Sequence, residues 1–101
     1  MRVTYTAGDV RQVVVSQPMP STRKRIVTLL PMGEFGSDRS IRDALRKLVR
    51  KGSLIGLNVT TTGIHPVRRA KLYGVAHQFE KLAHEMEKDS DFLADFLASQ
   101  V

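Results

Sequence analysis

The chain has 101 residues with 42% hydrophobic and 26% charged side chains, a length and balance that suit one globular domain. It contains no cysteine, which excludes disulfides and thiolate metal sites and fits a reducing compartment. Its apolar runs are too short to cross a bilayer, and its first ten residues lack the apolar core of a signal peptide. We therefore expect a cytoplasmic protein.

The positive charge is concentrated in the N-terminal part of the chain, whose formal net charge as a whole is +6. Residues 1–76 contain 14 Lys and Arg against 4 Asp and Glu, whereas residues 77–101 contain 2 against 6. This asymmetry indicates a polyanionic partner for the basic body and a separate role for the acidic tail. A membrane surface suits the chain less, because no segment combines a basic face with the bulky apolar face of an interfacial helix.

The first part of the chain predicts two helices. Residues 1–6 alternate apolar and polar side chains, as a short strand or an ordered arm does. Residues 7–17 are ambiguous, since their three consecutive valines favour a strand, but their place in the chain favours a helix. A second helix is predicted over residues 22–30, with Ser21 as its N-cap and Pro31 at its end.

Residues 37–51 predict a helix with one apolar and one basic face. The apolar side chains recur at helical spacing and are Ile41, Leu45, Leu48 and Val49. The other face carries Arg39, Arg42, Arg46 and Arg50. Ser37 can accept a backbone N–H of the first turn, and Gly52 can end the helix. Basic helix faces are usually solvated surface, but arginine binds phosphate and guanine through paired N–H groups, which favours an anionic partner.

The rest of the chain predicts a hairpin and two helices. Strands are expected over residues 54–59 and 67–75, joined by a tip over residues 60–66. The return strand carries a basic cluster of Arg68, Arg69 and Lys71. A helix is expected over residues 77–88, and a last one after a break at Asp89 and Ser90.

In this order of helix, helix, turn, basic helix and hairpin, the chain resembles the winged helix-turn-helix superfamily of DNA-binding regulators. The resembling segments are STRKRIVTLL for the second helix, SDRSIRDALRKLVRKGSL for the recognition helix, and LIGLNVT with RRAKLYGV for the wing strands. The resemblance implies a mainly α fold with a small β-hairpin. It divides the chain into a winged helix-turn-helix DNA-binding domain over residues 1–76 and a C-terminal helical tail over residues 77–101.

The resemblance also implies which residues contact DNA. The recognition helix lies in the major groove with its N-terminal half against base edges. Arginine can read guanine there, and aspartate can accept a hydrogen bond from cytosine. The candidates on this helix are Ser37, Arg39, Ser40, Arg42, Asp43, Arg46 and Arg50. Candidates for phosphate and wing contacts are Arg23, Lys24, Arg25, His65, Arg68 and Arg69. For Arg68 and Arg69 the alternative is a solvated edge that prevents aggregation.

The acidic tail has apolar spacing suited to a packing seam. We expect it to form a homodimer, because a winged domain already has its own core. The dimerisation candidates are Phe79, Leu82, Met86, Phe92, Leu93, Phe96 and Leu97. The alternative is that the tail folds back and completes the core of the single chain.

No catalytic motif is present. The chain has no Gly-rich phosphate loop, nucleophile elbow or HExxH motif. His77, Glu80 and His84 share a helix face, a spacing that ordinary surface residues also produce. We therefore expect no enzyme, metal site, cofactor or small-molecule substrate.

These features predict a sequence-specific double-stranded DNA-binding protein, a small dimeric transcriptional regulator that reads the major groove with residues 37–51. Two alternatives stay open. One is another nucleic-acid-binding role, as a replication, partition or packaging factor or an RNA binder. The other is an adaptor that docks its basic helix on an acidic protein.

Overall fold

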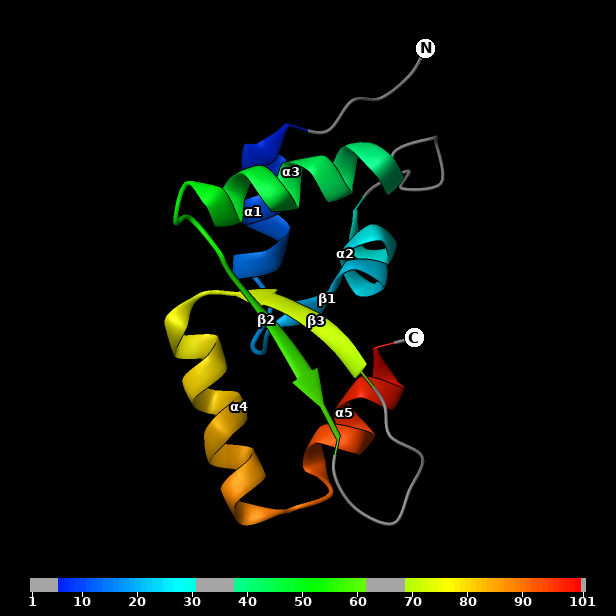
Figure 1. Ribbon diagram of the computed structural model, residues 1–101, viewed down its shortest axis with the longest axis vertical. Helices are drawn as coiled ribbons and strands as arrows, with labels where there is room; N and C mark the ends of the chain where they lie inside the picture. The colour runs from blue at the N-terminus through cyan, green and yellow to red at the C-terminus, as the bar shows by residue number, and fades with distance from the viewer. Residues whose placement is uncertain (1–5, 31–37, 62–68, 101) are drawn as a thin grey trace.

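The structure, a computed structural model, describes residues 6–30, 38–61 and 69–100 (Figure 1). The described chain is mostly helical with a small three-stranded antiparallel sheet, which agrees with the predicted mainly α class. In chain order the elements are α1 (Ala7–Val15), β1 (Ser21–Thr22), α2 (Arg23–Leu29), α3 (Asp38–Arg50), β2 (Ile55–Thr60), β3 (Arg69–Gly74), α4 (Ala76–Lys88) and α5 (Phe92–Ser99).

The prediction that the valine-rich first segment is a helix is confirmed. The Thr6 hydroxyl accepts the Asp9 backbone N–H, and the Asp9 carboxylate accepts the Thr6 backbone N–H, each at 3.1 Å. This reciprocal cap satisfies two N–H groups that a helix start otherwise leaves unpaired. Val10 and Val14 lie one turn apart and are fully buried, so packing outweighs the low helix propensity of valine.

The start of the second helix differs from the prediction. Its N-cap is Thr22, whose hydroxyl accepts the Arg25 backbone N–H at 3.2 Å, and not Ser21. Ser21 is instead buried in β1, a strand that the sequence did not predict. Two residues are too few to show an alternating pattern, and this strand exists only because it pairs with distant Tyr73 and Leu72.

Helix α3 has the apolar face that its sequence predicts. Ile41 and Leu45 are fully buried, and Leu48 is nearly so. The turn that ends the helix contains Gly52, whose φ of 76° is the left-handed conformation that glycine adopts without strain. The Ser53 backbone N–H then returns to the Leu48 carbonyl at 2.9 Å. The predicted N-cap, Ser37, lies outside the described residues.

The sheet has the order β1-β3-β2, so β3 is its central strand. Both predicted strands of the hairpin are confirmed, and their pairing places Leu57 opposite Leu72 and Gly56 opposite Tyr73. The predicted tip and the start of the return strand fall mainly in residues 62–68, outside the described part. Because β1 is short, it covers only the end of β3 near Tyr73.

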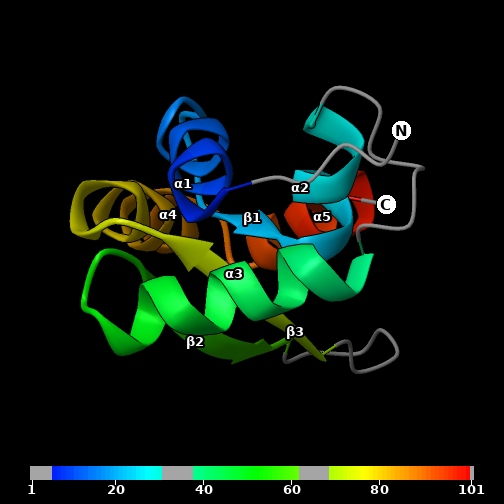
Figure 2. The ribbon, with the colours of Figure 1, turned by 90° about the horizontal axis from the view of Figure 1, so that it is seen from above.

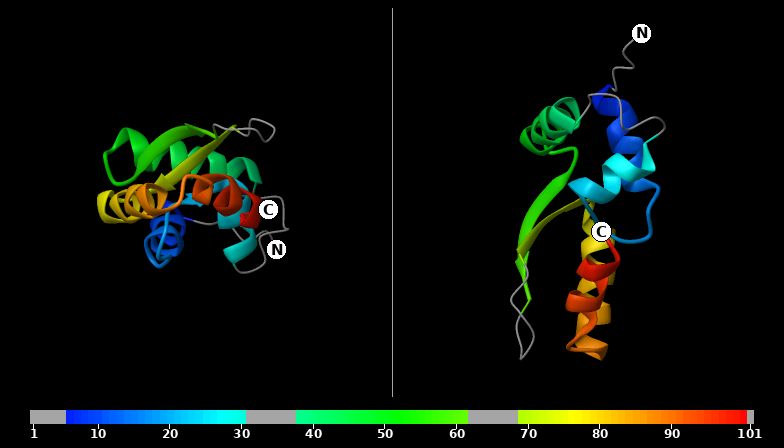
Figure 3. Two further views of the ribbon diagram at one scale, coloured as in Figure 1. Left: turned by 90° about the horizontal axis from the view of Figure 1, so that it is seen from below. Right: turned by 90° about the vertical axis from the view of Figure 1, so that its right-hand side faces the viewer.

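The two faces of the sheet pack against two separate apolar clusters. One cluster joins α1, α2 and α3 and has Tyr73 packed against it. The other joins Leu72 to the two C-terminal helices. The right panel of Figure 3 shows α3 across one end of the hairpin and α4 with α5 beside the hairpin further along. The helices before and after the hairpin therefore meet through the sheet.

The C-terminal helices complete the core of the single chain, which corrects part of the predicted dimer surface. Leu82, Leu93 and Leu97 are each at most 6% exposed and pack with Leu72. The partly buried aromatic residues around them are Phe79, Phe92 and Phe96. Leucines buried in one chain offer no surface to a second copy, so the alternative of a tail that folds back holds for these three. Met86 alone among the predicted dimer residues is exposed, at 39%.

A buried glutamine ties α4 to α1. The Gln78 side chain is fully buried, and its amide donates to the Val14 and Gln17 carbonyls at 2.9 and 2.7 Å. Its own oxygen accepts the Val75 backbone N–H at 2.8 Å. The buried amide thus has hydrogen-bond partners for both its nitrogen and its oxygen. A polar group can lie in a core only when it is paired in this way.

Candidate nucleic-acid interface

The basic face of α3 points to solvent. Arg39, Arg42, Asp43, Arg46 and Arg50 are all exposed, and Ser40 is half-buried. Within the described residues, no carboxylate forms an ion pair with Arg42 or Arg46. The predicted separation of an apolar and a basic face is therefore present. The arginine side chains have the reach and the hydrogen-bonding capacity to bind an anionic partner.

The centre of this basic face borders the sheet. A hollow of about 300 Å³ lies between α3, the start of α2 and β3, and Val49 and Tyr73 form its apolar part. Its cationic residues come from three elements and are Arg23, Arg42, Arg46 and Lys71. Segments far apart in the sequence thus bring four positive charges to one concave surface.

Gly56 explains how α3 and the sheet come this close. A Cβ atom built at Gly56 would lie 3.3 Å from Cγ2 of Val49 and 3.4 Å from Cε1 of Tyr73. The contact with Val49 is tighter than packed side chains normally make, so the missing side chain lets Val49 lie directly on the strand. The approach fixes the C-terminal half of α3 against the face of the sheet that carries Lys71.

Lys71 and Tyr73 are site residues that the sequence did not assign. The Lys71 ammonium lies 5.6 Å from the centre of the Tyr73 ring, a cation–π contact that holds the exposed lysine beside α3. Arg69 and Lys71 alternate with Ala70 and therefore share one face of β3. This alternation is visible in the sequence, but it does not reveal which face of the strand meets α3.

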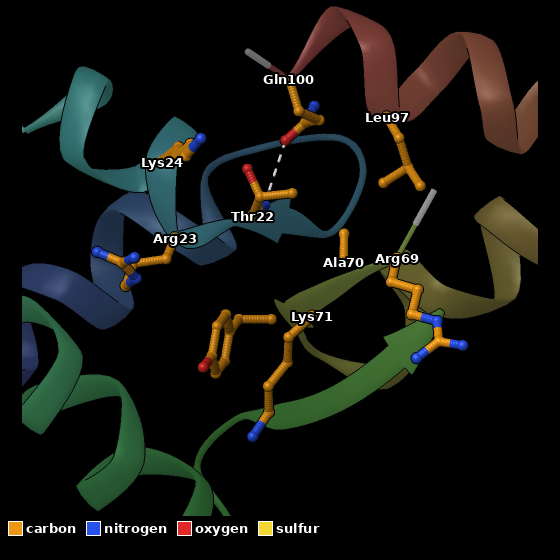
Figure 4. A pocket seen from close by; sticks show the side chains of 9 residues that line it. Thr22, Arg23, Lys24, Arg69, Ala70, Lys71, Leu97 and Gln100 are labelled. Atoms are coloured by element: carbon orange, nitrogen blue, oxygen red, sulfur yellow. Dashed lines mark hydrogen bonds between the residues drawn. The ribbon is translucent and has the colours of Figure 1, made fainter. Parts of the chain in front are cut away.

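A second hollow, of about 510 Å³, lies between the start of α2, β3 and the end of α5. The Gln100 side chain closes one side by accepting the Thr22 backbone N–H at 3.2 Å (Figure 4). In Figure 4 the charged ends of Arg23, Arg69 and Lys71 point away from its centre in different directions. The hollow therefore has a basic rim and does not focus its charges on one small anion.

The structure brings together only some of the predicted DNA contacts. The first hollow is lined by Arg23, Arg42 and Arg46. The second hollow is lined by Arg23, Lys24 and Arg69. Arg39 and Arg50 lie toward opposite ends of α3, outside both hollows. Arg25 is half-buried in α2 and lines neither hollow. The predicted contacts at Ser37, His65 and Arg68 lie outside the described residues.

The described ranges offer neither a cluster of metal-binding side chains nor a membrane-spanning helix. These ranges contain no group of three or more His, Asp and Glu side chains placed to hold a metal, and this includes His77, Glu80 and His84. None of the described helices is both long and apolar enough to cross a membrane.

Comparison with known proteins identified no relative. No family model matches the chain, and neither a curated protein nor a solved structure does.

Proposed function

We propose that the chain is a winged helix-turn-helix protein that binds double-stranded DNA sequence-specifically, as a small transcriptional regulator. The order α1-β1-α2-α3-β2-β3 supports this reading, because a basic helix follows two shorter ones and leads directly into a hairpin. The resemblance that the sequence suggests predicts this order of helices and hairpin, to which β1 is an addition.

The observation that carries the proposal is the convergence of Arg42 and Arg46 with Arg23 and Lys71 around the hollow between α3 and β3. A duplex carries phosphates on both sides of each groove, so a protein that seats a helix in a groove needs cations beside that helix as well as on it. Arg23 lies at the start of α2 and Lys71 lies on β3, which supplies cations beside α3 from two further elements.

In this proposal α3 enters the major groove. Its 13 residues form a rod about 20 Å long, and the groove of B-DNA is about 12 Å wide and admits one helix. Arg39, Arg42 and Arg46 contact base edges, where each bidentate arginine contact favours guanine. Lys71 and Arg69 contact the backbone beside the groove and set the register.

Double-stranded DNA suits this surface better than double-stranded RNA. The major groove of A-form RNA is deep and narrow, so side chains on an α-helix cannot reach its bases. A helix with four exposed arginines therefore suits B-form DNA. Single-stranded RNA is less suitable too, because Tyr73, the aromatic residue of this surface, is half-buried and contacts Lys71.

Selection from a random pool of duplexes tests the proposal. The purified chain is expected to enrich one short sequence, and that duplex is expected to bind more tightly than a scrambled duplex of equal composition. Enrichment of no sequence, with salt-dependent binding to all duplexes alike, would instead support a replication, partition or packaging role. Absence of salt-dependent binding to any nucleic acid would favour the adaptor alternative.

A further inference from the structure

Two of the large hydrophobic side chains that the structure exposes lie on β2. Ile55 is 40% exposed and Leu57 is 45% exposed. Leu57 pairs with Leu72 of β3, so both side chains lie on the same face of the sheet. On that face, α4 and α5 bury Leu72 completely. The apolar face of the sheet is therefore covered at its centre and uncovered at its outer strand.

The outer edge of β2 is also unprotected. In the described sheet β2 has β3 on one side and no strand on the other, and Figure 2 shows it at the margin of the molecule. Proteins usually guard such edges with charged side chains, proline or bulges, because unpaired backbone groups attract another strand. Residues 52–64 contain no charged residue and no proline, although the chain as a whole is strongly charged.

We propose that β2 pairs antiparallel with β2 of a second copy of this chain, which joins two three-stranded sheets into one of six strands. A second copy suits the strand because two chains of net charge +6 repel each other, and this repulsion is smallest where they meet through uncharged segments. An antiparallel pair of identical strands also satisfies itself through a two-fold axis, as isologous interfaces require.

Leu57 is more exposed than Ile55, so we place the two-fold axis at Leu57, which sets the register of this pairing. A two-fold axis perpendicular to the sheet at Leu57 places Leu57 opposite its own copy and Ile55 opposite Val59. All three side chains point to the same face, because residues two apart along a strand do so. The pairing therefore joins apolar side chains across the new interface, which is how neighbouring strands stabilise each other.

Because the axis is perpendicular to the sheet, the same face of each copy lies on the same side of the joined six-stranded sheet. Lys71 and the contact between Gly56 and Val49 of α3 lie on the opposite face from Leu57. The dimer therefore directs both basic surfaces to the same side, as a protein with two recognition helices requires. This pairing replaces the predicted tail interface, whose three leucines the single chain buries and whose three phenylalanines it partly buries.

Disulfide trapping tests the pairing without DNA, so its result is independent of the proposed function. The chain has no cysteine, and Leu57→Cys and Met86→Cys each introduce one at a site of similar exposure. Opposite residues of an antiparallel pair have Cα atoms about 4.5–5.5 Å apart, a distance that a disulfide spans. Under mild oxidation Leu57→Cys is expected to form a covalent dimer at least ten times faster than Met86→Cys.

Sedimentation of Lys variants is the second measurement. The natural chain is expected to sediment as a dimer at a protein concentration of tens of micromolar. The Met86→Lys variant is expected to sediment as a dimer too. Leu57→Lys is expected to raise the dissociation constant at least tenfold, because the axis brings two lysines together. A monomeric natural chain would contradict the pairing. Dissociation of the dimer by Met86→Lys and not by Leu57→Lys would also contradict it, as would faster disulfide formation by Met86→Cys than by Leu57→Cys. Either result would assign the interface to the tail.

Discussion

Gln78 is the residue whose loss we expect to harm the fold most without touching the proposed interface. Gln78→Met preserves length and helix propensity but leaves the Val14 and Gln17 carbonyls and the Val75 N–H without their partner. Leaving buried groups unpaired costs about 1–3 kcal/mol. We expect the free energy of unfolding in urea to fall by at least about 2 kcal/mol.

The matched control for this change is Gln12→Met, at an exposed position of α1. Surface substitutions of this kind change stability by less than about 0.5 kcal/mol. Equal stability of the two variants would show that the buried hydrogen bonds of Gln78 are dispensable.

Gly56 links the stability of the fold to the position of α3. Gly56→Val adds atoms where Val49 and Tyr73 already lie within 3.4 Å of a Cβ position. Overpacking of this kind costs about 1–3 kcal/mol and moves the contacting elements apart. We expect lower stability in urea together with weaker DNA binding in the variant, because α3 moves away from Lys71. Unchanged binding by a folded variant would show that the spacing of α3 and the sheet is not critical.

At the scale of elements, α3 and β3 are expected to contribute differently to binding. Arg69→Ala with Lys71→Ala removes the two proposed phosphate contacts of β3, so affinity is expected to fall for all duplexes alike. The slope of log affinity against log salt is expected to fall by up to about 2, one for each lost contact. Measurement of the slope for a selected and a scrambled duplex checks this. An unchanged slope would limit the sheet to a structural role.

The sequence predicted the helices and the hairpin well, because each carries its own periodicity. It did not predict β1, whose two residues acquire their structure from pairing with β3. It also did not settle the destination of the C-terminal helices. The spacing of Phe79, Leu82 and Met86 suits a dimer seam and a core-facing helix equally well. What decides between these two is the face of the sheet that carries Leu72, because the C-terminal helices pack on that face.

The part of the candidate site that lies on α3 was predictable, because helical periodicity is visible in the local sequence. Arg42 and Arg46 follow from helical spacing relative to Leu45, which the structure buries. Lys71 belongs to a recognisable basic cluster, but its meeting with α3 depends on the register of β2 against β3 and on the space at Gly56. Contacts between distant segments of this kind have no signature in local sequence.

At the scale of the whole molecule, residues 1–76 are not expected to fold alone. A chain that ends at Ala76 loses α4 and α5 and so exposes Leu72, the centre of the second apolar cluster. It also loses the Gln78 hydrogen bonds to α1. We expect loss of the cooperative urea transition that the full chain shows. A sharp transition in the shortened chain would mean that the tail is a separate unit, as the sequence first suggested.

The charge of the whole molecule sets the conditions for the decisive experiment. With a basic body of 14 Lys and Arg, some binding to any duplex is expected at low salt, and only specificity identifies recognition by α3. Affinities therefore need comparison at one physiological salt concentration. Lys81→Ala and Lys88→Ala, which remove exposed charges from α4, provide controls for loss of charge.

The most direct test of the proposed DNA recognition is the affinity of Arg42→Ala and of Arg46→Ala for the duplex selected by the natural chain. Both side chains are exposed, so the variants are expected to remain folded by circular dichroism. Each is expected to lose about 1–3 kcal/mol of specific binding, about 5- to 150-fold in affinity, while the two α4 controls lose far less. Unchanged affinity of both arginine variants for the selected duplex would contradict recognition of DNA by α3.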